Sequence, residues 1–241
     1  MFRPRRLLRS IIVANLALII FAVVLGLAKT GNPSRYFGEG RFTTGISCAQ
    51  LLGTAVFAFQ LFRVRRRGLR QPMLRSPHSV WLLAAGGFVF LACDDAFQLH
   101  EQFDYQIRRA FHLPKTALTD HIDDALIGLY GIMGAAVFWI CRREVLRFRH
   151  EMQRPLLAGF VSLLLSVICD AVANNRHVLL ALTPDVATAK WLDGWLSMGD
   201  GAFTLLAEGF FLAAFALGWL AAVSPAASSL HGDGQALEVA P

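Results

Sequence analysis

The chain has 241 residues, of which 55% are hydrophobic and only 17% are charged, and its mean hydropathy is +0.49. This composition is too apolar for an ordinary soluble domain or a disordered chain, and it indicates an integral membrane protein. The net charge of +6 does not indicate nucleic-acid binding, because arginine runs such as residues 63–67 border apolar segments, where the positive-inside rule places them.

Six apolar segments are long enough to cross a bilayer as helices, which takes about 20 residues each. The first follows four arginines like a secretory signal, but its apolar stretch of 18 residues is long for one, so we expect an uncleaved span. The predicted fold is an all-α bundle of six transmembrane helices in one domain, residues 1–223, with a disordered cytoplasmic tail at 224–241. The predicted spans are 11–28, 45–62, 79–99, 122–141, 155–173 and 201–223.

The basic residues predict the orientation. Loops on one side of the predicted spans carry 15 of the 23 Lys and Arg residues, whereas 13 of the 17 Asp and Glu residues lie on or near the other side. Because cytoplasmic loops carry the excess of Lys and Arg, both termini are predicted to be cytoplasmic, in a bacterial inner membrane. The bilayer is the expected partner, with the basic rim next to anionic headgroups.

Acidic and histidine side chains gather at the outer ends of the third to sixth spans, and the first two spans contain none. An ionised Asp within a span costs about 2.5–3.5 kcal/mol even on a lenient scale, so a cluster of such residues marks a functional site. The cluster comprises Asp94, Asp95, His100, Glu101, Asp120, His121, Asp123, Asp124, Asp170, Asn174, His177 and Asp200, with Glu208 about two turns deeper.

A shift of 76 residues superposes part of this pattern on itself. Cys93 falls on Cys169 and Asp94 on Asp170, while Gln98 falls on Asn174 and Glu101 on His177. On a continuous helix Asp94, Gln98 and Glu101 would share one face. The shift suggests a tandem repeat of two helical hairpins, spans three with four and five with six, around one outward pocket; chance coincidence is the alternative.

Carboxylate and imidazole groups together are ligands for a divalent metal such as zinc. With a bound metal, the natural reaction is hydrolysis of a lipid-like ester or amide, with Glu208, Asp95 and Glu101 as catalytic candidates and Glu208 as general base. A hydrogen-bonded network without an ion is the alternative, and an ion-coupled transporter or a non-catalytic accessory or sensor protein competes with the hydrolase. The candidate metal ligands are Asp94, His100, His121, Asp124, Asp170, His177 and Asp200.

Other reactive side chains have ordinary explanations. No Gly-x-Ser-x-Gly elbow occurs, and Ser166 has no partner implied by spacing. The four cysteines lie inside spans and none forms a Cys-x-x-Cys pair, so we expect small buried side chains, with a Cys93–Cys169 disulfide left open. His78 is expected to be an ordinary surface residue.

The run from Leu91 to Glu101, LACDDAFQLHE, resembles a signature of uncharacterised bacterial multi-pass membrane proteins, Asp-Asp/Glu-x4-His-Glu at the end of a hydrophobic segment. The resemblance covers about eleven residues and implies that Asp94, Asp95, His100 and Glu101 form that signature, without an activity. Alkaline ceramidase-like hydrolases look similar only in using Asp, His and Ser from several helices, because their histidine-rich C-terminal motif is missing here.

Overall fold

The computed structural model describes residues 4–38, 40–67, 78–112, 122–147 and 150–224, except for the side chains of residues 122–125, 127 and 176. The regular structure of these residues is entirely α-helical. The helices are α1 (Pro4–Thr30), α2 (Phe42–Arg66), α3 (Ser79–Phe97), α4 (Leu99–Phe111), α5 (Ile122–Ile140), α6 (Arg142–Val145), α7 (His150–Ala173), α8 (Arg176–Leu182) and α9 (Val186–Val223).

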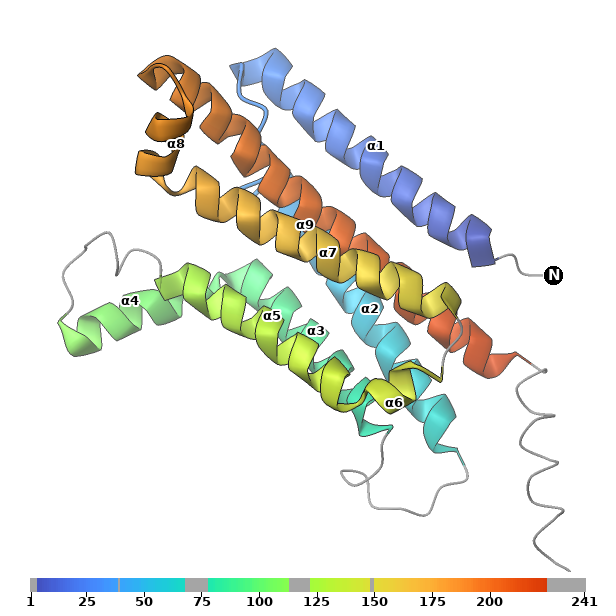
Figure 1. Ribbon diagram of the computed structural model, residues 1–241. Helices are drawn as coiled ribbons and strands as arrows, with labels where there is room; N and C mark the ends of the chain where they lie inside the picture. The colour runs from blue at the N-terminus through green and yellow to red at the C-terminus, as the bar shows by residue number, and fades with distance from the viewer. Residues whose placement is uncertain (1–3, 39, 68–77, 113–121, 148–149, 225–241) are drawn as a thin grey trace, which may run out of the picture.

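Helix α9 is the centre of the bundle. It packs along α7 on one side and along α2 and α1 on others, and α2 in turn packs along α3. Figure 1 shows α1 at one edge and the pair α3 and α5 at the opposite edge, with the short helix α4 turning away from the bundle. The predicted tandem hairpin repeat is not confirmed, because α7 packs closely on α9 whereas α3 packs mainly on α2 rather than on α5.

Five of the described helices are long and apolar enough to cross a membrane: α1, α2, α3, α7 and α9. The fourth predicted span, 122–141, is not confirmed: it corresponds to α5, Ile122–Ile140, whose described side chains form an apolar segment at Gly128–Ile140. Helix α9 has 38 residues and begins at Val186, not at residue 201 as predicted. At 1.5 Å per residue it is about 57 Å long, so it extends well beyond a hydrocarbon core of about 30 Å.

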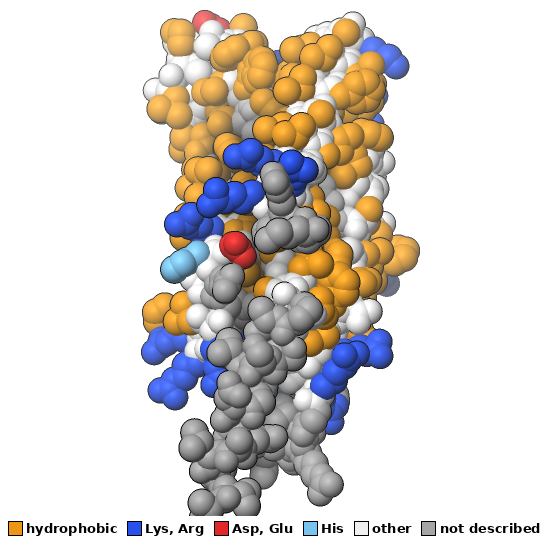
Figure 2. All heavy atoms as spheres, turned by 90° about the vertical axis from the view of Figure 1, so that its right-hand side faces the viewer, with side chains coloured by type: hydrophobic (Ala, Val, Ile, Leu, Met, Phe, Trp, Pro, Cys, Tyr) orange, Lys and Arg blue, Asp and Glu red, His pale blue; other side chains and the backbone are white. Residues whose placement is uncertain are grey.

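The two ends of the bundle differ in charge. At one end, called the arginine end here, α1 and α7 begin and α2 ends among Arg63, Arg65 and Arg66. Figure 2 views the molecule from this side, where Lys and Arg side chains gather between apolar surfaces. At the opposite end, called the acidic end, α3 and α7 finish close to Asp94 and Asp170.

Aromatic packing holds the central helices together. Trp81 and Phe215 are fully buried and meet edge-on, with ring centroids 5.9 Å apart. Gly159 lets α7 approach α9 closely, because a β-carbon there would lie 2.6 Å from Cε1 of Phe211. Small residues permit such close helix approach in lipid, where packing rather than the hydrophobic effect drives association.

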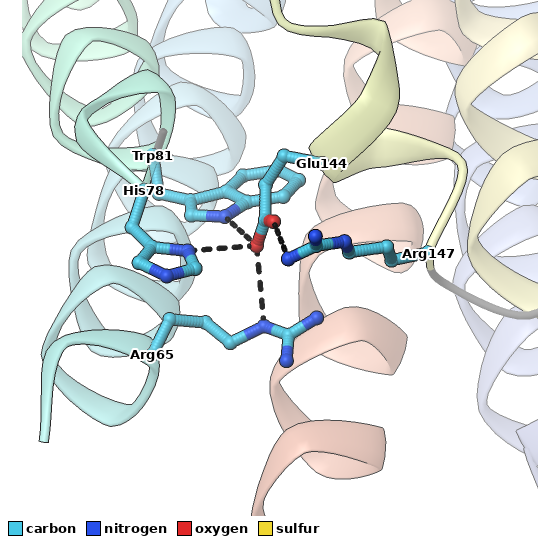
Figure 3. A network of polar contacts seen from close by, with 5 residues as sticks. All are labelled: Arg65, His78, Trp81, Glu144 and Arg147. Atoms are coloured by element: carbon cyan, nitrogen blue, oxygen red, sulfur yellow. Dashed lines mark hydrogen bonds and ion pairs between the residues drawn. The ribbon is translucent and has the colours of Figure 1, made fainter. Parts of the chain in front are cut away.

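A buried carboxylate joins α6 to α2 and α3 at the arginine end (Figure 3). Glu144 is 2% exposed; its Oε1 lies 2.9 Å from Nδ1 of His78 and 3.3 Å from Nε of Arg65. Trp81 Nε1 donates to the same oxygen (3.4 Å), and Oε2 pairs with Arg147 (3.3 Å). The expectation that His78 is an ordinary surface residue is therefore wrong, since its side chain is 12% exposed and faces this carboxylate.

Candidate functional site

The Asp94–Glu101 run forms the junction between α3 and α4. Helix α3 ends at Phe97, and Gln98 adopts a left-handed conformation (φ 53°). The chain then turns so that Asp94 accepts a hydrogen bond from the backbone N–H of His100 (2.9 Å) and faces Nδ1 of the same residue (2.9 Å). The predicted continuous face of Asp94, Gln98 and Glu101 is wrong, because the helix breaks between them.

This junction is built as a helix cap. The first backbone N–H groups of a helix have no partner within the helix, and a carboxylate at that end satisfies them. Asp94 and His100 are each 5% exposed, so the pair is buried under the turn. The signature therefore holds α4 at the acidic end of α3, and Asp94 and His100 act as one hydrogen-bonded pair.

The predicted metal ligands do not converge within the described part of the chain, where no three His, Cys, Asp or Glu side chains are grouped to hold an ion. Asp170 accepts from Asn174 one turn away (3.0 Å), and His177 is exposed on α8. Glu101 lies in a shallow depression beside Gln102. His121 and the side chain of Asp124 lie outside the described residues.

Asp200 forms a polar contact between α9 and α7. Ser166, 4% exposed on α7, donates to Oδ1 of Asp200 (2.5 Å), and its Oγ also lies 2.8 Å from Oγ1 of Thr204. The spacing along the sequence implied no partner for Ser166, and Asp200 was expected at the start of a helix. The second expectation is wrong, because α9 begins 14 residues before Asp200 and carries the carboxylate into the bundle.

Glu208 lies deeper on α9 and is 6% exposed. Ser47 of α2 donates to its Oε1 (2.5 Å), whereas its Oε2 is buried with no hydrogen-bond partner among the described residues. No described Lys, Arg or His pairs with this carboxyl. A neighbouring acid, Asp95, lies on α3 with its Oδ2 3.6 Å from Sγ of Cys48. Two carboxyls thus share the space between α2, α3 and α9.

Helix α2 carries a polar stripe that the sequence analysis missed. Thr43, Ser47, Gln50 and Thr54 are all buried, and their spacing of four, three and four residues places them on one helix face. Gln50 donates from Nε2 to Oδ1 of Asn15 on α1 (2.8 Å), and its Oε1 is a second buried acceptor without a partner in the described structure. The helical period of these neutral residues is the signal in the sequence that indicates this buried face.

The cysteines form no disulfide in the structure. All four, Cys48, Cys93, Cys141 and Cys169, are free thiols. The pairing of Cys93 with Cys169 that the sequence left open is therefore absent. Cys169 lies close to Asp170 and Asp200, so its thiol lies beside these two carboxyl groups.

Almost the whole chain matches one known protein family. Residues 7–226 match the model of a family described as a domain of unknown function, DUF8692. The chain belongs to this family. The match includes α2 to α9 and nearly all of α1, and with them the buried carboxyl groups of Asp94, Glu144 and Glu208. No curated protein and no solved structure matches the chain.

Proposed function

We propose that this member of the DUF8692 family is an ion-coupled membrane protein that binds a proton at Glu208. The observation that carries the proposal is a pair of buried acceptor oxygens without donors, Oε2 of Glu208 and Oε1 of Gln50. A buried polar atom without a partner costs about 1–3 kcal/mol, and more when the group is charged. Such atoms are rare, and the two occur on facing helices at the same polar cluster.

A proton satisfies both oxygens at once. Protonated Oε2 becomes a hydrogen-bond donor, and Gln50 lies on the α2 face that also presents Ser47. Ser47 already donates to Oε1, so the neutral carboxyl would accept from Ser47 and donate toward Gln50. The close packing of the next residue supports this placement, since a β-carbon at Gly209 would lie 3.2 Å from Oε1 of Gln50.

The surroundings of Glu208 favour a proton over a larger cargo. The titratable groups near it are Asp95 on α3 and the Cys48 thiol on α2, and α1 contributes only the neutral Asn15. Toward the arginine end α2 continues with Ala58 and Leu61, both fully buried in the aromatic core. The aromatic core therefore separates Glu208 from the arginine end, whereas polar groups lie between Glu208 and the acidic end. We expect Glu208 to exchange its proton with the acidic end.

The six-span arrangement fits the same proposal. If α5 completes the crossings, α1 begins and α9 ends on the same side of the membrane, and the arginine end is cytoplasmic by the positive-inside rule. Glu208 then takes its proton from the external side of a bacterial inner membrane. The metal-dependent hydrolase of a lipid-like substrate stays a prediction, to which the described residues contribute no ligand set.

The proposal is tested by infrared difference spectroscopy of the full chain in lipid vesicles stepped between acidic and alkaline buffer. We expect a carbonyl band from a protonated carboxyl group in wild type that Glu208→Gln removes. Ser47→Ala should shift the band, because it deletes the donor to Oε1. A sodium titration at fixed pH should leave the band unchanged, which distinguishes a proton from a small monovalent cation.

Asp104→Asn is the matched control, because Asp104 is paired with Arg108 on α4 (2.7 Å), away from α9. It should leave the carbonyl band at full amplitude. A spectrum in which Glu208→Gln changes nothing would overturn the proposal, and so would a band that sodium removes at constant pH.

A further inference from the structure

We infer that Asp200, Ser166 and Thr204 form a proton relay between the acidic end of the bundle and Glu208. The inference rests on the proposed function, because it supplies the path by which Glu208 exchanges its proton. It assigns a role to a serine and a threonine of the apolar bundle that are hydrogen-bonded to each other and, through Ser166, to Asp200.

The relay follows α9. Asp200, Thr204 and Glu208 are four residues apart, so each lies one helical turn from the next and close to the same face. Four residues turn an α-helix by about 40° more than one full turn. Asp200 and Glu208 therefore point toward different neighbouring helices. Asp200 and Thr204 meet Ser166 on α7, whereas Glu208 meets Ser47 on α2.

The first two links are direct hydrogen bonds. Ser166 Oγ lies 2.5 Å from Oδ1 of Asp200 and 2.8 Å from Oγ1 of Thr204. Ser166 has one hydroxyl proton, which it donates to the carboxylate, so the Thr204 hydroxyl is the donor in the second bond. The chain of donors therefore runs from Thr204 through Ser166 to Asp200.

The third link crosses one turn of α9. Side chains four residues apart on a helix have β-carbons about 5–6 Å apart, a gap that one water molecule or rotation of the longer Glu208 side chain closes. Oε2 of Glu208 is the atom that makes this link, because Oε1 is already bonded to Ser47; its proton turns from Gln50 toward Thr204 as the transfer begins.

The transfer conserves protons and breaks no other bond. The O–H bond of protonated Glu208 breaks as its proton binds Oγ1 of Thr204; the hydroxyl proton of Thr204 moves to Oγ of Ser166, and that of Ser166 moves to Oδ1 of Asp200. Glu208 ends as a carboxylate and Asp200 as a neutral acid. The same transfers in the opposite direction, from Asp200 through Ser166 and Thr204 to Glu208, carry a proton inward.

Asp200 connects with the surface through α7. Asp170 and Asp200 both lie near the Cys169 thiol, and Asp170 is bonded to Asn174, which is exposed. Asp200 itself is only partly buried. These groups give the relay an opening at the acidic end, whereas the aromatic core closes the arginine end.

The relay is tested by the rate at which the Glu208 carbonyl band responds to a rapid pH jump, in vesicles containing the full chain. Thr204→Val and Ser166→Ala remove one hydroxyl each, and we expect the rate to fall by about tenfold or more while the final amplitude of the band is unchanged. Thr204→Ser should restore the wild-type rate, because it keeps the hydroxyl. This rescue separates loss of the relay from loss of packing.

Ser162→Ala is the matched control, since Ser162 is also buried on α7 one turn from Ser166, and it should leave the rate unchanged. Wild-type rates in both Thr204→Val and Ser166→Ala would overturn the relay while leaving proton binding at Glu208 intact. Absence of the Glu208 band in wild type is the different result that defeats the proposed function itself.

Discussion

Two buried glutamates, one at the arginine end of the bundle and one deep within it, have opposite kinds of partner. Glu144 at the arginine end is contacted by Arg65, His78, Trp81 and Arg147. Glu208, within the membrane-spanning part of α9, accepts a hydrogen bond from Ser47 and has one oxygen without a partner among the described residues. Their exposed fractions, 2% and 6%, are nearly equal, so burial does not distinguish them.

The partners decide the role of each carboxyl. A buried carboxylate surrounded by cationic donors keeps its charge and ties together the elements that supply the donors. A buried carboxyl without a cation is favoured in its neutral form, because ionising it in an apolar span is costly. Glu144 therefore acts as a structural link among α2, α3 and α6, whereas Glu208 is suited to gaining and losing a proton.

The largest expected effect comes from breaking the link at Glu144. Glu144→Ala leaves Arg65 and His78 facing each other without their common acceptor, and removing one member of a buried pair costs about 3–5 kcal/mol. We expect the thermal unfolding midpoint of the protein in detergent to fall by several degrees, as followed by calorimetry.

Glu208→Gln should have no such cost, since the amide keeps an acceptor for Ser47 and offers a donor to Gln50. We expect its unfolding midpoint to stay much closer to the wild-type value than that of Glu144→Ala. Equal losses of stability in Glu144→Ala and Glu208→Gln would contradict the division of roles between the two residues.

A medium effect is expected at Asp94, whose partner is the single histidine His100. Asp94→Ala removes the acceptor for the first turn of α4, and loss of such a cap costs about 1 kcal/mol. Hydrogen exchange should quicken over residues 99–103 and stay unchanged in α9. Asp94→Asn keeps an oxygen for the backbone N–H of His100 and should protect the turn better; equal exchange in the two variants would argue against the cap.

The smallest effect is expected at the exposed cap Asp185. Hydrogen bonds from the backbone N–H and hydroxyl of Thr188 lower the pKa of the Asp185 carboxyl. Because the folded pKa lies below the unfolded value of about 3.9, the cap stabilises α9 fully above that pH and is lost as the pH falls through the lowered pKa.

Asp185→Ala should therefore increase hydrogen exchange in the first turn of α9 at neutral pH, with the difference from wild type vanishing in strong acid. A difference that persists unchanged in acid would mean that the carboxylate charge is not what caps the helix.

Some of these features could be predicted from the sequence and others could not. The length of the apolar segments predicted membrane helices. Within a bilayer, a single segment can satisfy its backbone hydrogen bonds only as a helix. It did not predict the break at Gln98, since Phe97 to Glu101 contains no Gly or Pro to mark one. The acids at Asp94, Asp200 and Glu208 stood out individually, but the sequence grouped Asp94 and Asp200 as metal ligands and made Glu208 a general base.

The sequence by itself determined that this chain is helical, apolar and asymmetric in charge, because hydropathy and charge act locally along the chain. Only the tertiary structure decided which carboxyl meets which partner. Glu144 meets Arg65 across 79 positions, and Glu208 meets Ser47 across 161 positions. Such contacts depend on which helix faces pack together. In the sequence alone, Ser47 is an ordinary serine in an apolar segment.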